Sequence, residues 1–234
     1  MILTAHQPVY IPWIGLFHKI ALADQFCIFD RVQYQTKDFN NRNKIKTQAG
    51  DIWLSVPVES KNHFNTLICD IKIVQNNWRK KHLKSIKLAY QKSPYFELYY
   101  PEIESIILRN HLFLSELNHD ILMLMLKWFD IKCRIVRASD YNFQGNKSEL
   151  VLDMCKTLGA DSYIFGAQGK DYADVNQFSQ ENIKIYFQEY NHPSYSQLHG
   201  EFKPYMSALD LLFNVGEQAK IILFKNNITT ILRN

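Results

Sequence analysis

The stretch MILTAHQPVYIPWIGLFHKIALADQFCIFD, residues 1–30, decides the fold class. Two short apolar runs, at residues 1–5 and 25–29, flank a segment at 14–23 whose apolar residues recur at helical spacing. Strand, loop, helix and strand in this order is the plan of a βαβ unit, whose two strands lie parallel in one sheet. The opening of the chain therefore predicts a parallel-sheet protein.

The rest of the chain continues this alternation near its end and interrupts it in the middle. We expect strands at residues 52–58, 68–74, 133–139, 162–165 and 183–187. Helices are expected at 77–90, 101–110, 115–129 (capped by Ser115), 147–158 and 206–213, and the polar stretch 33–51 is expected to be a loop. No Gly-, Pro- or Ser-rich linker divides the chain. We predict one compact α/β domain over residues 1–234, a parallel-sheet core of βα units with a helical insertion at about 76–130.

The composition excludes several classes of protein. Hydrophobic residues make up 47% of the 234 and charged residues 21%, which is typical of a globular protein and not of a disordered chain. The net charge of +4 suits anionic ligands but is small for a dedicated nucleic-acid binder. No membrane span and no secretory signal are recognisable. The four cysteines lie far apart, which indicates reduced thiols, so we expect a cytoplasmic protein.

The loop after the first strand is the first candidate site. In open α/β sheets, ligands bind beyond the carboxyl ends of the strands, near the point where the strand order reverses. This loop holds His6, Gln7, Tyr10 and Trp13, and the N-terminus of the following helix can bind a phosphate or carboxylate. The alternative is a histidine and two aromatic residues packed into a rigid, proline-bounded connection.

A second polar loop follows the second strand and is expected to lie beside the first. Its amide groups suit a hydroxyl-rich ligand, and its cations suit phosphate because they offer charge-assisted donors. An ordinary solvated loop is the alternative. The candidates for substrate binding are Asp30, Gln33, Tyr34, Lys37, Asn41, Arg42 and Asn43.

Two later segments add candidates. One is a glycine-containing loop after the strand at 162–165, which lacks the Walker spacing, and the other is rich in His, Tyr and Gln outside any element. Their residues are Gly166, Gly169 and Lys170, then His192, Tyr195 and His199. The basic face of the helix at 77–90 is expected to be solvated, or else to meet a ligand diphosphate. The chain has no HExxH, paired CxxC, GxSxG or GxGxxG, and its histidines are dispersed, so no metal site is predicted.

Taken together, these motifs resemble those of the WbqC-like family. They are AHQPVYIPWIGLFHKIALADQFCIFDRVQYQTKDFNNRNKIKT, WLSVPV, WRKKHL, SPYF, GKDY, HPSY and PYMSALDLLFN, and they cover essentially the full chain in order. Members of that family are found with genes for bacterial surface polysaccharide (lipopolysaccharide), particularly O-antigen. The resemblance implies a transferase that attaches glycine or a similar small acyl group to the amine of a nucleotide-linked amino sugar.

A fold-level analogy points to the kind of chemistry. The opening of this chain is also similar to that of nucleotidyltransferase-like (HUP-like) adenylating enzymes such as pantothenate synthetase, which pass an acyl-adenylate to an amine. The chain departs from their H-x-G-H signature, because His6 has no second histidine three residues later. If ATP drives the activation, Mg²⁺ is expected through the phosphates and Asp30. If a coenzyme or a charged transfer RNA supplies the acyl group, neither ATP nor Mg²⁺ is required.

The expected catalytic residues are His6, Gln7 and Lys170. His6 is expected to act as a general base or a phosphate donor, Gln7 to orient the substrate, and Lys170 to clamp a phosphate or carboxylate. Asn41 is expected to be a second orienting amide and Arg42 a second clamp. Tyr34 and Trp13 are expected to stack against the ligand. The rival hypothesis is a non-catalytic sugar- or nucleotide-binding partner of the polysaccharide machinery, which would use the same loops for recognition alone.

Overall fold

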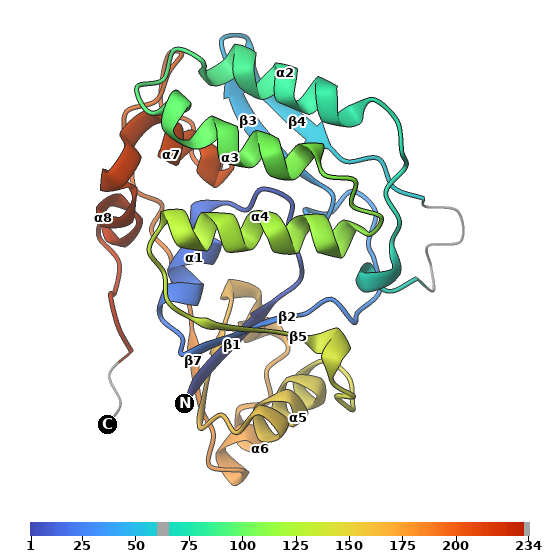
Figure 1. Cartoon of the computed structure of the whole chain (residues 1–234). Helices are drawn as coiled ribbons and strands as arrows, with labels where there is room; N and C mark the ends of the chain where they lie inside the picture. Colours follow the sequence, from blue (N-terminus) through green and yellow to red (C-terminus); the bar gives the residue numbers. More distant parts are fainter. Residues whose placement is uncertain (60–65, 232–234) are drawn as a thin grey trace.

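A parallel sheet is the centre of the fold in the computed structural model, which describes residues 1–59 and 66–231 (Figure 1). Its strands lie in the order β5-β2-β1-β6-β7, and every neighbouring pair is parallel. The strands are β1 (Ile2–His6), β2 (Gln25–Ile28), β5 (Arg134–Arg137), β6 (Ser162–Phe165) and β7 (Lys184–Phe187). Counted along the chain, these strands have the spatial order 3-2-1-4-5 of a Rossmann or HUP-like core. The predicted α/β fold class is confirmed.

Helices cover both faces of the sheet (Figure 1). One face carries α1 (Ile14–Ala21) and α8 (Ala219–Phe224), and the other carries α5 (Ser148–Leu158) and α6 (Val175–Gln180). Leu3 of β1 packs in the cluster formed with α5 and α6. Because side chains alternate along a strand, the even-numbered residues of β1 point towards α1, and His6 is one of them.

The segment between β2 and β5 adds a hairpin and three helices on the α1 face. The hairpin pairs β3 (Arg42–Thr47) with β4 (Gly50–Ser55), and the helices are α2 (Trp78–Tyr90), α3 (Phe96–Leu108) and α4 (Leu114–Trp128). Their apolar side chains join those of α1 and of α7 (Ala208–Val215) in one core cluster. α4 lies nearest the sheet (Figure 1), so it can contribute side chains to the carboxyl edge. The division of the chain into domains stays a prediction.

Several predicted elements were wrong in type or extent. Residues 33–51, expected as a loop, contain β3, which buries Ile45 and pairs with β4. The strand expected at 68–74 is a single 3-10 turn, η2 (Ile68–Asp70), followed by isolated bridges.

The predicted helix ends also differ from the structure. The cap of α4 is Phe113, whose backbone N–H donates to the Glu116 carboxylate at 3.2 Å, and Ser115 lies inside the helix. α3 begins earlier than predicted, and α7 is shifted from 206–213 to Ala208–Val215.

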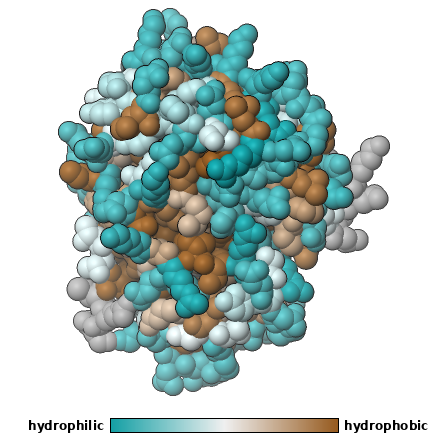
Figure 2. All heavy atoms as spheres, viewed as in Figure 1, coloured by the Kyte–Doolittle hydropathy of each residue, from teal (hydrophilic) through white to brown (hydrophobic). Residues whose placement is uncertain are grey.

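Apolar surface gathers in the middle of the face drawn in Figure 1, in the band between α4 and the sheet, as Figure 2 shows. Ile131 before β5 and Ile135 within it are partly buried and pack against the main core. The helical layer and the sheet therefore share apolar contacts across this band. Among the described residues, no helix has both the length and the apolar character needed to span a bilayer.

Candidate functional site

The candidate site lies where β1 and β6 separate at the carboxyl edge of the sheet. β1 pairs with β2 as far as His6, which lies opposite Ile28, but its pairing with β6 stops at Thr4, opposite Ile164. The chain continues from β1 to its neighbour β2 and from β6 to β7 on the other side, so the strand order reverses between β1 and β6. In α/β proteins such a reversal opens a crevice in which ligands bind.

Lys19 of α1, which was not among the predicted site residues, occupies this opening. Its Nζ donates to the backbone oxygen of Ala5 at 2.9 Å and lies 3.8 Å from where a Cβ would stand on Gly166. The side chain is 3% exposed, and burial alone lowers the pKa of Lys19 to about 8. No carboxylate in residues 1–59 or 66–231 pairs with it. A lone lysine within the apolar helical run IGLFHKIALA is the signal that points to it.

His6 stands at the end of β1 as a half-buried, neutral imidazole. Its Nδ1 lies 2.8 Å from the backbone oxygen of Gln7, and a carbonyl oxygen can only accept, so Nδ1 carries the proton. The other ring nitrogen, Nε2, then presents a lone pair and has no hydrogen-bond partner within the described part of the chain. Burial, and then the charge of Lys19, lower the pKa of His6 to about 4.

The first and second polar loops touch through asparagine amides. The Nδ2 of Asn40 donates to the side-chain oxygen of Gln7 at 3.3 Å and to the backbone oxygen of Pro8 at 2.8 Å. The buried amide of Asn43 donates to the backbone oxygen of Ile11 at 2.8 Å. Ile11 has φ 38°, a left-handed value that is unusual for a β-branched residue. These bonds hold the loop after β1 in a path that it would not take alone.

The glycine loop after β6 borders the same opening but is a tight turn. Gly166 is its first residue, and Gly169 donates its N–H to the Gly166 oxygen at 2.9 Å. A Cβ on Gly169 would stand 2.4 Å from the Cβ of Phe165, so only glycine fits there. Since the N–H of Gly169 is already bonded, this loop does not have the open form of a phosphate-binding loop.

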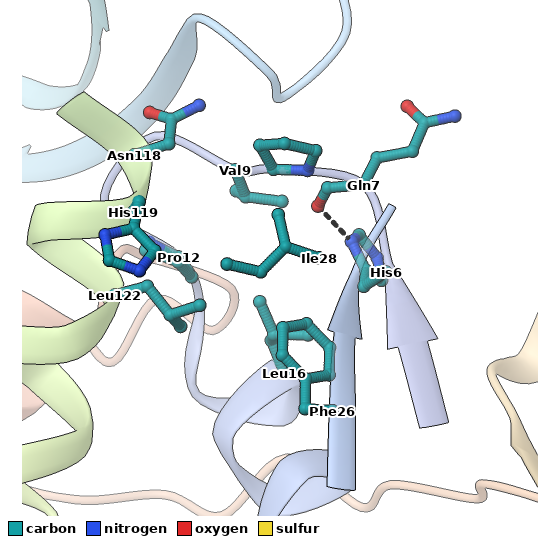
Figure 3. A pocket seen from close by; sticks show the side chains of 11 residues that line it. His6, Gln7, Val9, Pro12, Leu16, Phe26, Ile28, Asn118, His119 and Leu122 are labelled. Atoms are coloured by element: carbon teal, nitrogen blue, oxygen red, sulfur yellow. Dashed lines mark hydrogen bonds between the residues drawn. The ribbon is translucent and has the colours of Figure 1, made fainter. Parts of the chain in front are cut away.

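A small hollow lies beside His6 on the α1 face of the edge. Its open volume is about 10 Å³, which is space for one water molecule. Figure 3 shows that its lining comes from the loop after β1, from α1 and β2, and from α4: His6, Gln7, Pro8, Val9, Pro12, Leu16, Phe26, Ile28, Asn118, His119 and Leu122. The inserted segment thus adds the polar groups of α4 to this side of the edge.

A larger cavity opens on the α5 face of the same edge. Its volume is about 660 Å³, and its walls are the loops after β2 and β5, the first turn of α5, and Tyr172 after β6. Its charged lining residues are Arg31 and Lys147, and no acidic residue of the described chain lines it. Of the predicted site residues, Gln33 alone lines this cavity. The run YNFQGNK at 141–147, rich in amides after a strand, is the sequence signal that was missed.

Comparison with known proteins places the chain in a family. It matches the WbqC-like protein family over residues 7–222. The chain belongs to that family. It is 35% identical over 215 residues to an uncharacterized protein of Mycobacterium tuberculosis, Rv1507c, a match that covers 91% of this chain and 93% of that protein. No solved structure matches the chain significantly.

In this WbqC-like chain, Asp30 does not fit its predicted role as a ligand of magnesium. Its two carboxylate oxygens accept hydrogen bonds from the backbone N–H and the hydroxyl of Ser139, each at 2.9 Å, and the side chain is buried. Asp30 instead ties the loop after β2 to the turn after β5. Among the described residues, no group of three or more His, Cys, Asp and Glu side chains could hold a metal ion.

Three further predicted residues have structural partners inside the fold. Tyr10 is fully buried, and its hydroxyl lies 2.9 Å from the Nδ1 of His82. The amide of Asn41 donates to the backbone oxygen of Val56 at 2.8 Å. Tyr34 is buried in the main core cluster. These contacts account for each residue by packing and hydrogen bonding within the family fold.

The predicted cationic clamps are bonded to groups of the protein itself. Arg42 lies over the ring of Trp53, with its Cζ 4.2 Å from the ring centre, and donates to the backbone oxygen of Lys37. Lys37 is exposed, with φ 64°. Lys170, expected to be catalytic, forms an exposed ion pair with Glu189 at 2.8 Å. Lys19, which was not predicted, is therefore the cation that the structure places inside the crevice.

The aromatic and histidine candidates of the C-terminal segment gather around Trp13. The rings of Trp13 and His192 stack with centroids 6.5 Å apart, and Tyr195 stacks on His192 at 6.4 Å. The hydroxyl of Tyr195 donates to Asp210 at 2.9 Å, and burial raises the pKa of that carboxyl. His199 lies apart, with its Nε2 2.9 Å from a backbone oxygen of α2. This cluster joins the C-terminal segment to the start of α1.

Proposed function

We propose that this protein is a cytoplasmic transferase of bacterial surface polysaccharide synthesis. It attaches glycine or a similar small acyl group to the amine of a nucleotide-linked amino sugar. The observation that carries the proposal is that His6, whose Nε2 can accept a proton, and the buried ammonium of Lys19, whose charge acts on His6, both lie at the switch in strand order. An amine that attacks a carbonyl must lose a proton while the carbonyl oxygen gains charge, so a base beside a cation suits both needs.

The proposed step balances with these two groups. The amine nitrogen bonds to the carbonyl carbon of an activated acyl donor, and the bond from that carbon to the leaving group breaks with its electron pair. The Nε2 of His6 takes the proton that the amine releases. The ammonium of Lys19 offsets the charge on the carbonyl oxygen, and it stays protonated at pH 7 because its pKa is about 8. An anionic ligand nearby raises the pKa of His6 towards the working range of a base.

A non-catalytic sugar- or nucleotide-binding partner is the second candidate, and two observations favour it. A pKa of about 4 makes His6 a weak base in the free protein, since general bases work best near the operating pH. The 660 Å³ cavity on the α5 face has neither histidine nor carboxylate among its described lining residues. A site of that composition recognises a ligand without transferring protons.

Transfer of radiolabelled glycine tests the proposal. The protein is incubated with UDP-, GDP- and dTDP-linked amino sugars, and with glycine plus ATP and Mg²⁺, glycyl-coenzyme A or glycyl-transfer RNA as the donor. The expected result is an amide-linked, labelled sugar nucleotide from one donor. Glycine-dependent exchange of pyrophosphate into ATP would assign the donor to an adenylate. Tight binding of the sugar nucleotide with no product from any donor would instead establish the accessory role.

A further inference from the structure

The cavity on the α5 face is lined mainly by segments that follow three strands of the sheet. The loop 29–33 follows β2, the loop 138–147 follows β5, and Tyr172 lies beyond β6. Because β2 and β6 flank β1, a cavity lined from both of them passes beside the carboxyl end of β1. His6 stands at that end on the opposite face of the sheet, so the cavity and the imidazole border the same carboxyl edge from its two faces.

The charge of the cavity favours an anion with more than one negative group. Arg31 donates one N–H to the backbone oxygen of Tyr141 at 2.8 Å, which holds the guanidinium at the cavity and leaves its other donors for a ligand. Lys147 precedes α5, and its ammonium has no hydrogen-bond or ion-pair partner among the described residues. Two separate cations, in a lining to which no acidic residue of the described chain contributes, suit the two phosphates of a diphosphate.

The aromatic lining suits a nucleobase. Phe143 lines the cavity and stacks on Tyr141, with ring centroids 5.1 Å apart and planes 7° from parallel, so its ring is held as a flat platform. Tyr172, after β6, also lines the cavity, is 44% exposed and lies edge-on to Phe165. Stacking of a base on an aromatic ring contributes about 1–3 kcal/mol and tolerates any base. The amides of Asn142 and Asn146 can bond to sugar hydroxyls.

The walls are held in place without a ligand. The two hydrogen bonds between Asp30 and Ser139 join the loop after β2 to the turn after β5. The backbone N–H of Gln144 donates to the carboxylate of Asp153 on α5 at 2.8 Å, which fixes the middle of the second loop. A preformed site of about 660 Å³ loses little conformational entropy on binding and lies in the size range of ligand pockets.

We infer that this cavity binds a nucleoside diphosphate, as the nucleotide part of the proposed substrate. The phosphates lie between Arg31 and Lys147, the base stacks on the aromatic walls, and the attached sugar extends across the end of β1 to His6. The inference rests on the proposed function for the attached amino sugar, whereas binding of the nucleoside diphosphate is tested without it.

Calorimetry with UDP, GDP, CDP and dTDP tests the site, with inorganic pyrophosphate as a probe of charge alone. We expect at least one nucleoside diphosphate to bind at least about 10-fold more tightly than pyrophosphate, because the base adds stacking. Lys147→Gln and Arg31→Gln should each weaken that binding by about 10-fold or more, the size of a charge-assisted hydrogen bond. Lys84→Gln, an equal loss of charge on the exposed face of α2, should leave it unchanged. Equal melting temperatures of Lys147→Gln and the wild type show that the variant folds.

The outcomes separate this inference from the proposed function. Failure of every nucleoside diphosphate to bind the wild type, or unchanged affinity in both cavity variants, would overturn the inference. If Lys147→Gln transfers glycine with an unaltered KM for the sugar nucleotide, the cavity is not the nucleotide site, but the proposed transferase activity is upheld. If the cavity variants lose binding and no donor gives transfer, the cavity is upheld as the nucleotide site and the proposed transferase activity is refuted.

Discussion

The two faces of the sheet's carboxyl edge satisfy their polar groups in different ways. On the α1 face, the Nζ of Lys19 and the amides of Asn40 and Asn43 are buried and bonded to backbone oxygens of β1 and its loop. On the α5 face, Arg31, Asn142 and the other polar lining residues are exposed around an open cavity. Buried groups in fixed geometry suit a chemical step, and exposed groups on fixed loops suit recognition. The comparison therefore supports the two proposals, which put the reaction on one face of the edge and nucleotide binding on the other.

Replacing His6 should have the largest effect, and only on turnover. His6→Gln removes the Nε2 lone pair while keeping a polar side chain of similar reach, so kcat for glycine transfer should fall by about 10²–10⁴-fold. The KM for the sugar nucleotide should stay within a factor of about 3, because the proposed nucleotide site lies on the other face. Steady-state kinetics measures both constants.

His199→Gln is the matched control, since that histidine bonds to a backbone oxygen of α2 away from the edge. Its kcat should equal that of the wild type. A rise in KM with kcat unchanged in His6→Gln would mean that His6 binds the substrate, and the division between the two faces would then fail.

Lys19 should make stability depend on pH in the alkaline range. In the folded protein Lys19 loses its proton near pH 8, and in the unfolded chain near 10.5. Between these values the unfolded state binds more protons, so the free energy of unfolding contributed by Lys19 rises with pH. The full rise corresponds to about 3 kcal/mol.

Urea titrations of the wild type and Lys19→Met from pH 7 to 10.5 measure this rise, and Lys84→Met serves as the exposed control. The wild type should gain stability relative to Lys19→Met as pH increases, because the other titrating groups are common to both proteins. Parallel profiles would show that Lys19 is solvated, and the α1 face would then be as wet as the α5 face.

A pair of asparagine variants compares the faces directly by stability. Asn43→Ala removes a fully buried amide that bonds to Ile11 and to its neighbour's N–H, so the free energy of unfolding should fall by about 2 kcal/mol. Asn142→Ala, in the exposed lining of the cavity, should change it by less than about 0.5 kcal/mol. Denaturant titration measures both, and equal losses would contradict the contrast between the two faces.

The fold could be predicted wherever the types of residue and the spacing of the apolar residues indicated the same kind of element. The strands β1, β2 and β6 were placed within about one residue, because each is a short apolar run beside helical or turn signals. β3 was missed because Arg42, Lys44 and Lys46 read as a solvated loop. The structure buries Lys46 against the C-terminal segment, where its Nζ donates to Gln197 at 3.0 Å. That partner lies too far along the chain for local pattern to reveal it.

The candidate site could be predicted in part for the same reason. His6 was placed at the edge because it ends the first strand, and strand ends meet ligands in this class of sheet. The role of Asp30 depends on Ser139, which is distant in sequence and becomes a neighbour only when β5 pairs with β2. Lys19 stands out as a lysine in an apolar helical run, but its place in the crevice could not be predicted, because the crevice is the gap left where β1 and β6 stop pairing.

The inserted segment between β2 and β5 has a consequence for the order in which the protein folds. β2 finds its neighbour β5 only after the whole of residues 29–133 has been synthesised, and β1 finds β6 later still. Strand pairs so distant in sequence form only after long loops close, and loop closure costs conformational entropy before any contact between the strands offsets it. Such topologies therefore fold slowly. The helices α2, α3 and α4 rest on local contacts, and they can form while the central strand still has one open edge.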